Sequence, residues 1–138
     1  MILYIDSSAI LRSLLGQTGA LEEDEPYSNV VTSVLAEVEC LRSVDRFRIR
    51  ERLDDVRAAA LREGVFRLLE GVETIEITRS LLRSASHQMP TLLSLVDAIH
   101  LTTALSWRER VDEDLTFATH DRALATAARG SGLPVIGV

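Results

Sequence analysis

Residues 1–6 of the chain read MILYID, a run of five apolar residues that ends on an aspartate. A continuous apolar run of this length is typical of a strand that is buried on both faces, as the strands of parallel sheets are. Residues 7–15 (SSAILRSLL) then read as a short helix. A buried strand followed directly by a helix predicts the first unit of an α/β fold.

The same alternation continues to the end of the chain. Further strands are predicted at residues 29–32, 73–77, 115–119 and 134–138. Helices are predicted from Ser33, a good N-cap, to about residue 44, and at 50–69, 79–87, 92–107 and 121–129. The acidic run at 22–26 (EEDEP) predicts a solvated loop. The predicted fold class is therefore α/β: a single-domain three-layer α/β/α sandwich with a mostly parallel five-stranded sheet.

Composition excludes several classes of protein. The 138 residues suffice for one domain, and the single cysteine excludes a disulfide framework. All 15 basic residues are arginines, which excludes lysine-dependent Schiff-base enzymes, Walker A phosphate loops and receiver domains. No apolar run is long enough to cross a membrane and residues 1–8 lack the basic flank of a signal peptide, so a cytoplasmic location is expected. The net charge of -6 predicts weak binding to nucleic acid by bulk electrostatics alone.

Three aspartates are candidates for chemistry. Asp6 directly follows the first predicted strand and Asp121 follows the fourth, where sites form in open parallel sheets. Each is explained equally well as a helix N-cap. Asp97 is the only charged residue, His100 aside, in the apolar helix predicted at 92–107. A buried carboxylate needs a partner, which is either an arginine from elsewhere or a bound cation.

A fourth acid comes from the helix that follows the second strand. Glu37 and Glu39 are both candidates, but two residues on a helix are about 200° apart, so only one can face a given site. The apolar positions Val34, Leu35, Val38 and Leu41 centre nearer Glu37, which leaves the choice open. Four carboxylates from separate segments suggest a cluster that binds a cation, and oxygen ligands favour Mg²⁺ or Mn²⁺ over zinc.

Four stretches together resemble PIN-domain ribonucleases, and most closely the VapC-type toxins of bacterial toxin–antitoxin pairs. They are IDSSAI at 5–10, VTSVLAEVECLR at 31–42, LLSLVDAIHLTTAL at 92–105 and FATHDRALATAARGSGLPVIGV at 117–138. The resemblance implies one PIN domain over residues 1–138. It implies that the catalytic and metal-binding acids are Asp6, Glu39, Asp97 and Asp121. Glu39 is preferred to Glu37 because its surroundings match the family pattern V-E-x-x-R.

The departures from the family pattern are small. His120 stands where relatives often have tyrosine, and Cys40 stands where an aliphatic residue is usual. Thr119 and Ser7 match positions that support the metal site from its edge.

The resemblance also implies a function. One or two Mg²⁺ (or Mn²⁺) ions would bind the four acids and activate a water that hydrolyses RNA, leaving 5′-phosphate and 3′-hydroxyl ends. The partners implied are the RNA substrate, a cognate VapB-type antitoxin protein and a second copy of the chain in a homodimer. The alternatives are a housekeeping PIN nuclease in RNA processing and a non-catalytic PIN-like interaction module. Since the chain has no lysine, RNA contacts must come from arginines, with candidates Arg12, Arg42, Arg46 and Arg122.

Overall fold

The computed structural model describes residues 1–17 and 27–138, so the acidic loop predicted at 22–26 lies outside the described residues. Its centre is a five-stranded sheet of order β3-β2-β1-β4-β5, in which all neighbouring strands are parallel. The strands are β1 (Ile2–Ile5), β2 (Asn29–Ser33), β3 (Glu73–Ile75), β4 (Leu115–Ala118) and β5 (Val135–Ile136). The predicted α/β class is confirmed, and the sheet is parallel throughout.

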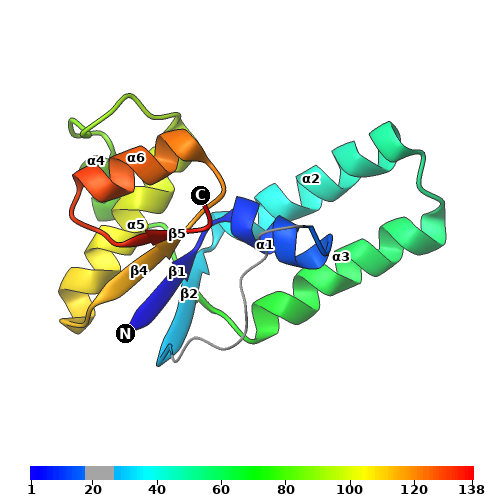
Figure 1. Ribbon diagram of the computed structural model, residues 1–138, viewed down its shortest axis with the longest axis horizontal. Coiled ribbons are helices and arrows are strands. Elements are labelled where there is room, and N and C mark those ends of the chain that lie inside the picture. The colour runs from blue at the N-terminus through cyan, green and yellow to red at the C-terminus, as the bar shows by residue number, and fades with distance from the viewer. Residues whose placement is uncertain (18–26) are drawn as a thin grey trace.

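Helices cover both faces of this sheet, which gives the three predicted layers (Figure 1). The helices are α1 (Ser7–Leu14), α2 (Leu35–Glu51), α3 (Asp55–Glu70), α4 (Arg79–Ala85), α5 (Leu95–Val111) and α6 (Arg122–Gly130). The first three pack on one face; α5 and α6 pack on the other, and α4 packs against α5. None of the helices in the described part of the chain is long and apolar enough to cross a membrane.

The central strand β1 explains why the first residues of the chain are all apolar. Ile2 and Tyr4 point into the core under α5 and α6, whereas Leu3 and Ile5 point into the core under α1 and α2. All four are at most 6% exposed, because alternate side chains of a strand enter opposite layers. The prediction that this strand is buried on both faces is confirmed.

The largest difference from the sequence prediction lies in the hairpin formed by α2 and α3, which projects from the sheet in Figure 1. One helix was expected to end near residue 44 and the next to begin at residue 50; instead α2 continues to Glu51 and α3 begins at Asp55. The turn is fixed by Arg52, which has left-handed backbone geometry, and by Asp54, whose carboxylate accepts a hydrogen bond from the Arg57 amide.

The start of α2 also differs from the prediction. Ser33 is the last residue of β2, and Val34 is the N-cap of α2 with no side-chain capping bond. The Ser33 hydroxyl still accepts a hydrogen bond from the Leu35 amide at 3.2 Å, so it satisfies a free amide at the helix start from one position further back.

Several other helices begin where the sequence supplies a capping side chain. Side-chain oxygens accept hydrogen bonds from amides of the first turn at the starts of α1, α4, α5 and α6, from Asp6, Thr78, Ser94 and Asp121. Helix α5 therefore begins after Ser94, later than the predicted residue 92, and it continues past residue 107 to Val111. Two strands are shorter than predicted, since β3 ends at Ile75 and β5 contains only Val135 and Ile136.

Candidate active site

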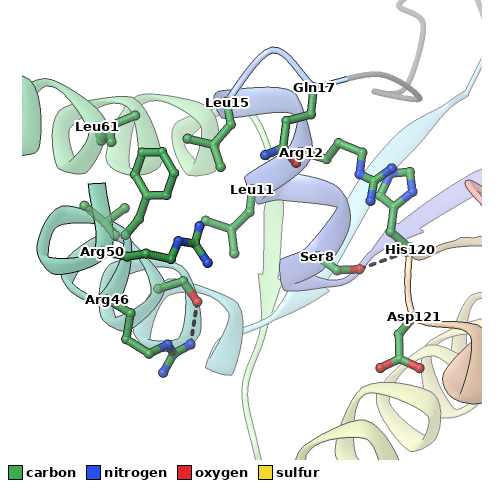
Figure 2. A pocket seen from close by; sticks show the side chains of 13 residues that line it. Ser8, Leu11, Arg12, Leu15, Gln17, Arg46, Arg50, Leu61, His120 and Asp121 are labelled. Atoms are coloured by element: carbon green, nitrogen blue, oxygen red, sulfur yellow. Dashed lines mark hydrogen bonds between the residues drawn. The ribbon is translucent and has the colours of Figure 1, made fainter. Parts of the chain in front are cut away.

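A pocket opens beside the carboxyl end of the sheet, and Asp121 and His120 line one end of it (Figure 2). Both residues follow β4, which pairs directly with β1. Asp6 follows β1 at the same edge, because parallel neighbouring strands end on the same side of a sheet. The topology therefore places two of the predicted acids at one edge.

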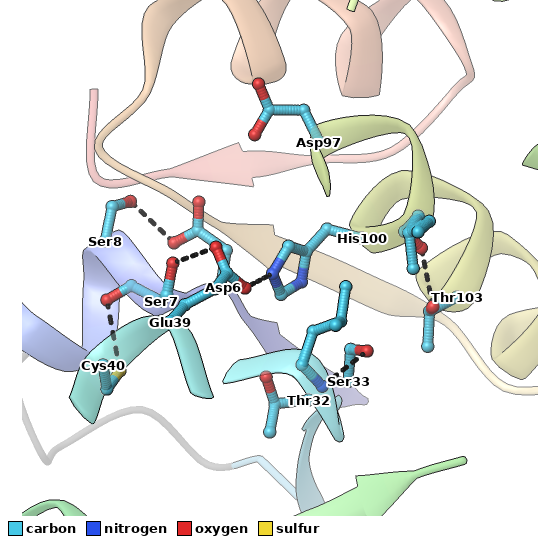
Figure 3. Close-up of polar contacts among 12 residues, drawn as sticks. Asp6, Ser7, Ser8, Thr32, Ser33, Glu39, Cys40, Asp97, His100 and Thr103 are labelled. Carbon is cyan, nitrogen blue, oxygen red and sulfur yellow. Dashed lines mark hydrogen bonds and ion pairs between the residues drawn. The ribbon is translucent and has the colours of Figure 1, made fainter. Parts of the chain in front are cut away.

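Asp6 is buried and tightly held at this edge (Figure 3). Its side chain is only 3% exposed. One carboxylate oxygen accepts hydrogen bonds from the Ala9 amide at 2.9 Å and from the Ser8 hydroxyl at 2.7 Å. The other accepts from the Thr119 hydroxyl, which follows β4. Asp6 is thus the N-cap of α1 and also a preorganised carboxylate at the sheet edge, so the two interpretations of its sequence position are compatible.

Helix α2 brings Glu39, and not Glu37, to the same place. The Glu39 carboxylate contacts His100 Nε2 at 2.5 Å and accepts a hydrogen bond from the Ser7 hydroxyl at 2.9 Å. Glu37 is exposed. The apolar pattern pointed toward Glu37, and this hint was wrong, because the buried stripe of α2 consists of different residues: Ala36, Cys40 and Val44. Val38, one of the apolar residues in that pattern, is 55% exposed.

His100 connects Glu39 to the core. It is 1% exposed, and its Nδ1 lies 2.7 Å from the Tyr4 hydroxyl. Burial, with a further contribution from the Asp6 charge, raises the pKa of Tyr4 well above its ordinary value, so the phenol keeps its proton. The phenol then donates to Nδ1, which assigns the ring proton to Nε2, and Nε2 donates to Glu39. Sequence reasoning favoured a packed core histidine; the ring is packed in the core and also bonded to a candidate site acid.

Asp97 approaches from α5, on the opposite face of the sheet (Figure 3). Its side chain is half-buried. Burial raises the pKa of Asp97, and the negative charges of Asp121 and Asp6 raise it further, while a hydrogen bond with Ser94 acts in the opposite direction. The ion pairs formed within residues 1–17 and 27–138 include no arginine paired with Asp97, so the predicted alternative of an arginine partner is not realised there.

Asp121 completes the set at the start of α6. It is exposed, and one carboxylate oxygen accepts a hydrogen bond from the Leu124 amide at 3.0 Å, as an N-cap does. Its own amide donates to the Thr119 hydroxyl at 3.0 Å. Thr119 therefore connects the loop that carries Asp121 to the carboxylate of Asp6.

The negative charge of the site affects a buried neighbour as well. Burial raises the pKa of Cys40 to about 12, and the charges of Glu39 and Asp6 contribute to this rise. The thiol therefore stays protonated, and it donates a weak hydrogen bond to the Ser7 carbonyl at 3.8 Å. Cys40 is a buried packing residue, as its place in the sequence indicated.

The donor chemistry of the site fits a hard divalent cation. No three His, Cys, Asp or Glu side chains of the described residues lie close enough together to form a ready metal-binding group. Mg²⁺ does not require such a group, because it keeps several waters and usually binds through only one or two carboxylates. The candidates contribute carboxylate oxygens alone, whereas zinc prefers nitrogen and sulfur ligands. Mutual repulsion between Asp97, Asp121 and Asp6 would be relieved by a cation.

Comparison with known proteins identifies the fold family. Residues 3–130 match the PIN domain family. The chain belongs to this family. Among curated proteins, this PIN domain is 26% identical to Ribonuclease VapC47 of Mycobacterium tuberculosis (strain CDC 1551 / Oshkosh) over 139 residues, which cover 95% of this chain and 93% of the relative.

Solved structures show the same PIN fold. A structure of FitAB bound to the IR36 DNA fragment matches with a TM-score of 0.68 and 16% identity, covering 99% of this chain and 94% of that chain. VapBC2 from Rickettsia felis, bound to a DNA fragment from its promoter, matches with a TM-score of 0.63 and 11% identity, covering 98% and 97%. VapC20 from Mycobacterium tuberculosis, described as a sarcin–ricin loop cleaving toxin, matches with a TM-score of 0.58 and 20% identity, covering 91% and 94%.

Proposed function

We propose that this PIN domain is an endoribonuclease toxin that hydrolyses RNA phosphodiesters with a divalent cation and is neutralised by a cognate antitoxin protein. The observation that carries the proposal is the arrangement of four acids, from β1, α2, α5 and the start of α6, around one edge of the sheet. A curated relative named as a VapC ribonuclease, similar over nearly the whole chain, supports the same reaction class. Because its substrate is cellular RNA, we expect the protein to act in the cytoplasm.

Mg²⁺ or Mn²⁺ is the proposed cofactor. Asp6 and Asp97 are the principal proposed ligands, and Glu39 and Asp121 complete a second position or hold waters. The support is the oxygen-only donor set together with the raised pKa of Asp97, whose ionised form a cation would favour. When bound, the ion supplies Lewis acidity to the phosphodiester and acidifies water.

The chain's own residues prepare this chemistry. Ser8, Thr119 and the Ala9 amide fix both oxygens of Asp6 before any ligand arrives. His100 and Ser7 fix Glu39 in the same way, because both contact its carboxylate at hydrogen-bond distance. Carboxylates held in position beforehand need no reorganisation at the moment of reaction, so their oxygens would already be placed to hold a cation and to orient a water.

The proposed partners follow from the relatives. The solved neighbours include VapBC complexes, so we expect a VapB-type antitoxin to bind this chain. We also expect a homodimer. Leu92 and Leu95, before and at the start of α5, are 101% and 73% exposed and offer an apolar surface for a protein contact.

The test is cleavage of single-stranded RNA by purified Asp6→Asn. The asparagine can still cap α1, so the variant should fold, but it lacks the charge that binds the cation. We expect cleavage to fall by at least about 100-fold and wild-type cleavage to stop in EDTA. Asp54→Asn is the matched control, since Asp54 is an exposed N-cap of α3 outside the site. Wild-type rates in Asp6→Asn, or in EDTA, would refute the metal-site assignment.

A further inference from the structure

The pocket beside Asp121 extends well beyond the four acids. It has a volume of about 460 Å³ and runs from Ser8, His120 and Asp121 past α1 to α2 (Figure 2). One of its walls is part of the candidate active site, because the Ser8 hydroxyl donates to the Asp6 carboxylate and accepts a hydrogen bond from the His120 amide at 2.9 Å. A molecule in this pocket would therefore lie next to the proposed cleavage site.

The pocket is basic in a chain whose net charge is -6. Its described lining contains three arginines and a single acid, Asp121. Arg46 donates to the Ser43 hydroxyl at 2.8 Å, and the ion pairs of the described residues give it no carboxylate partner. Arg50 lies over the Phe47 ring at 5.4 Å and also pairs with Glu51 at the exposed surface. These guanidinium groups suit a phosphate, which they can bind through two parallel hydrogen bonds.

The same pocket offers an apolar wall and free polar atoms. Phe47 presents an aromatic ring, and the leucines that share the lining are Leu11, Leu15 and Leu61. Both ring nitrogens of His120 are buried, and neither has a hydrogen-bond partner in the described part of the chain. Buried polar atoms without partners are uncommon in native proteins, and a bound ligand is one way to satisfy them. An aromatic ring beside basic groups is a standard arrangement for stacking a nucleobase next to its phosphate.

We propose that this pocket between α1 and α2 binds the nucleotide that flanks the cleaved phosphodiester in single-stranded RNA. Its base would lie against Phe47, its phosphate would contact Arg46 and Arg50, and His120 would contact the sugar or base on the side of Asp121. The volume falls in the range of about 300–1,000 Å³ found for ligand sites and has room for about one nucleotide. This inference rests on the proposed ribonuclease function and adds a subsite that selects the substrate.

The charge contribution is tested by Arg46→Ala and Arg50→Ala, with a pool of single-stranded 12-nucleotide RNAs of randomised sequence as substrate. Each variant should raise KM by about 10-fold while kcat stays within about 3-fold, since a flanking phosphate contributes to binding more than to the chemical step. The dependence of log KM on log salt concentration should also become shallower by about 0.7 per lost phosphate contact. Arg57→Ala, an exposed arginine on α3 outside the pocket, is the matched control and should leave both quantities unchanged.

The base contact is tested by sequencing the RNA ends that cleavage produces. Wild-type protein should show a base preference at one position next to the cut. Phe47→Leu keeps an apolar side chain but removes the aromatic face, so it should reduce that preference by about 5-fold or more. The leucine variant is preferred to alanine because Phe47 is partly buried and the fold must be preserved.

Measurements of RNA binding without cleavage test the pocket independently of the proposed ribonuclease function. The same RNA pool is titrated by fluorescence anisotropy with no divalent cation, so that binding is measured without cleavage. If wild-type protein cleaves RNA but Arg46→Ala behaves like Arg57→Ala in KM, salt dependence and binding, the subsite is overturned and the function stands. If wild-type protein cleaves nothing but Arg46→Ala weakens RNA binding by about 10-fold, the pocket binds single-stranded RNA and the proposed ribonuclease function fails. Loss of binding only to a co-expressed antitoxin would assign the pocket to that protein and overturn the inference.

Discussion

The two halves of the candidate active site are built differently. Asp6 and Glu39, which extend from β1 and α2, form an inner pair whose oxygens accept hydrogen bonds from serine, threonine, histidine and backbone groups. Asp97 and Asp121, which extend from α5 and the start of α6, form an outer pair that is more exposed than Asp6. The outer pair has fewer such bonds, and its charges act on each other strongly enough to help raise the pKa of Asp97.

This difference in hydrogen bonding and exposure indicates different roles for the inner pair and the outer pair. The inner pair is fixed by its hydrogen bonds, so under the proposed function it would define where a cation lies. The charges of the outer pair repel each other, and a bound cation would relieve this repulsion.

The largest effect is expected for Glu39→Gln in the inner pair. Glutamine can keep the contact with His100 but has no negative charge, so RNA cleavage should fall by at least about 100-fold with the fold intact. Glu37→Gln, two residues away on the same helix and exposed, is the matched control and should stay within about 2-fold of wild type. RNA cleavage rates measure the activity of both variants, and circular dichroism checks that both are folded. If the two variants lose activity equally, Glu39 is not a residue of the active site.

A smaller effect on RNA cleavage is expected for Tyr4→Phe. This variant removes a hydrogen bond to His100, the residue that contacts Glu39 of the inner pair. The variant removes the phenol that donates to His100 Nδ1 and leaves a buried acceptor without a partner. The free energy of unfolding should fall by about 1–3 kcal/mol, measured by urea denaturation. Cleavage should fall by only several-fold, since Glu39 keeps its charge.

The same variant tests how His100 is protonated. Nitrogen-15 NMR should place the proton of the wild-type ring on Nε2 and show both tautomers in Tyr4→Phe. A wild-type ring with its proton on Nδ1 would contradict the assigned hydrogen-bond direction. His87→Gln, a variant of an exposed histidine, identifies one of the three histidine signals and should leave the His100 signal unmoved.

The smallest effect is expected for Asp97→Asn in the outer pair, measured on metal-free protein. Because the folded pKa of Asp97 is raised, its contribution to stability is fully present below the ordinary value of 3.8 and is lost as pH rises through the folded pKa. Asparagine removes this loss, so the variant should be more stable at pH 7 by less than about 1 kcal/mol and equal to wild type at a pH well below 3.8. Thermal unfolding in EDTA at both pH values measures the difference.

Added Mg²⁺ should reverse that order. The ion should raise the Tm of wild-type protein at pH 7 and raise the Tm of Asp97→Asn less, because binding to the folded state stabilises it. Glu70→Gln, an exposed acid at the end of α3, controls for the general loss of one negative charge. An Asp97→Asn variant that is less stable than wild type at pH 7 without metal would contradict the repulsion between the outer acids.

Much of the fold could be predicted because the signals were local. The apolar run at the start of the chain indicated a doubly buried strand, and such a strand must lie inside a sheet covered on both faces. Asp6 and Asp121 were correctly placed after neighbouring strands, since parallel strands end at one edge. The boundary between α2 and α3 was missed because a left-handed turn at Arg52 leaves little trace in an arginine-rich segment.

The candidate active site could be predicted only in part from the amino-acid sequence. The choice between Glu37 and Glu39 could not be made from periodicity, because α2 buries Ala36 and Cys40 as well as larger residues and its apolar pattern is weak. The role of His100 was underestimated for a related reason. Its two partners, Tyr4 and Glu39, are 96 and 61 residues away in sequence, and no local pattern connects them.

By itself, the sequence determined the order of strands and helices and the positions of Asp6 and Asp121 just after strands, because these depend on neighbouring residues. Only the tertiary structure decided which face of α2 meets β1, which of two glutamates joins Asp6, and that a basic pocket lies beside an acidic site in an acidic protein. The physical reason is that these properties depend on the relative orientation of packed elements. That orientation is set by side chains far apart in the chain filling one core.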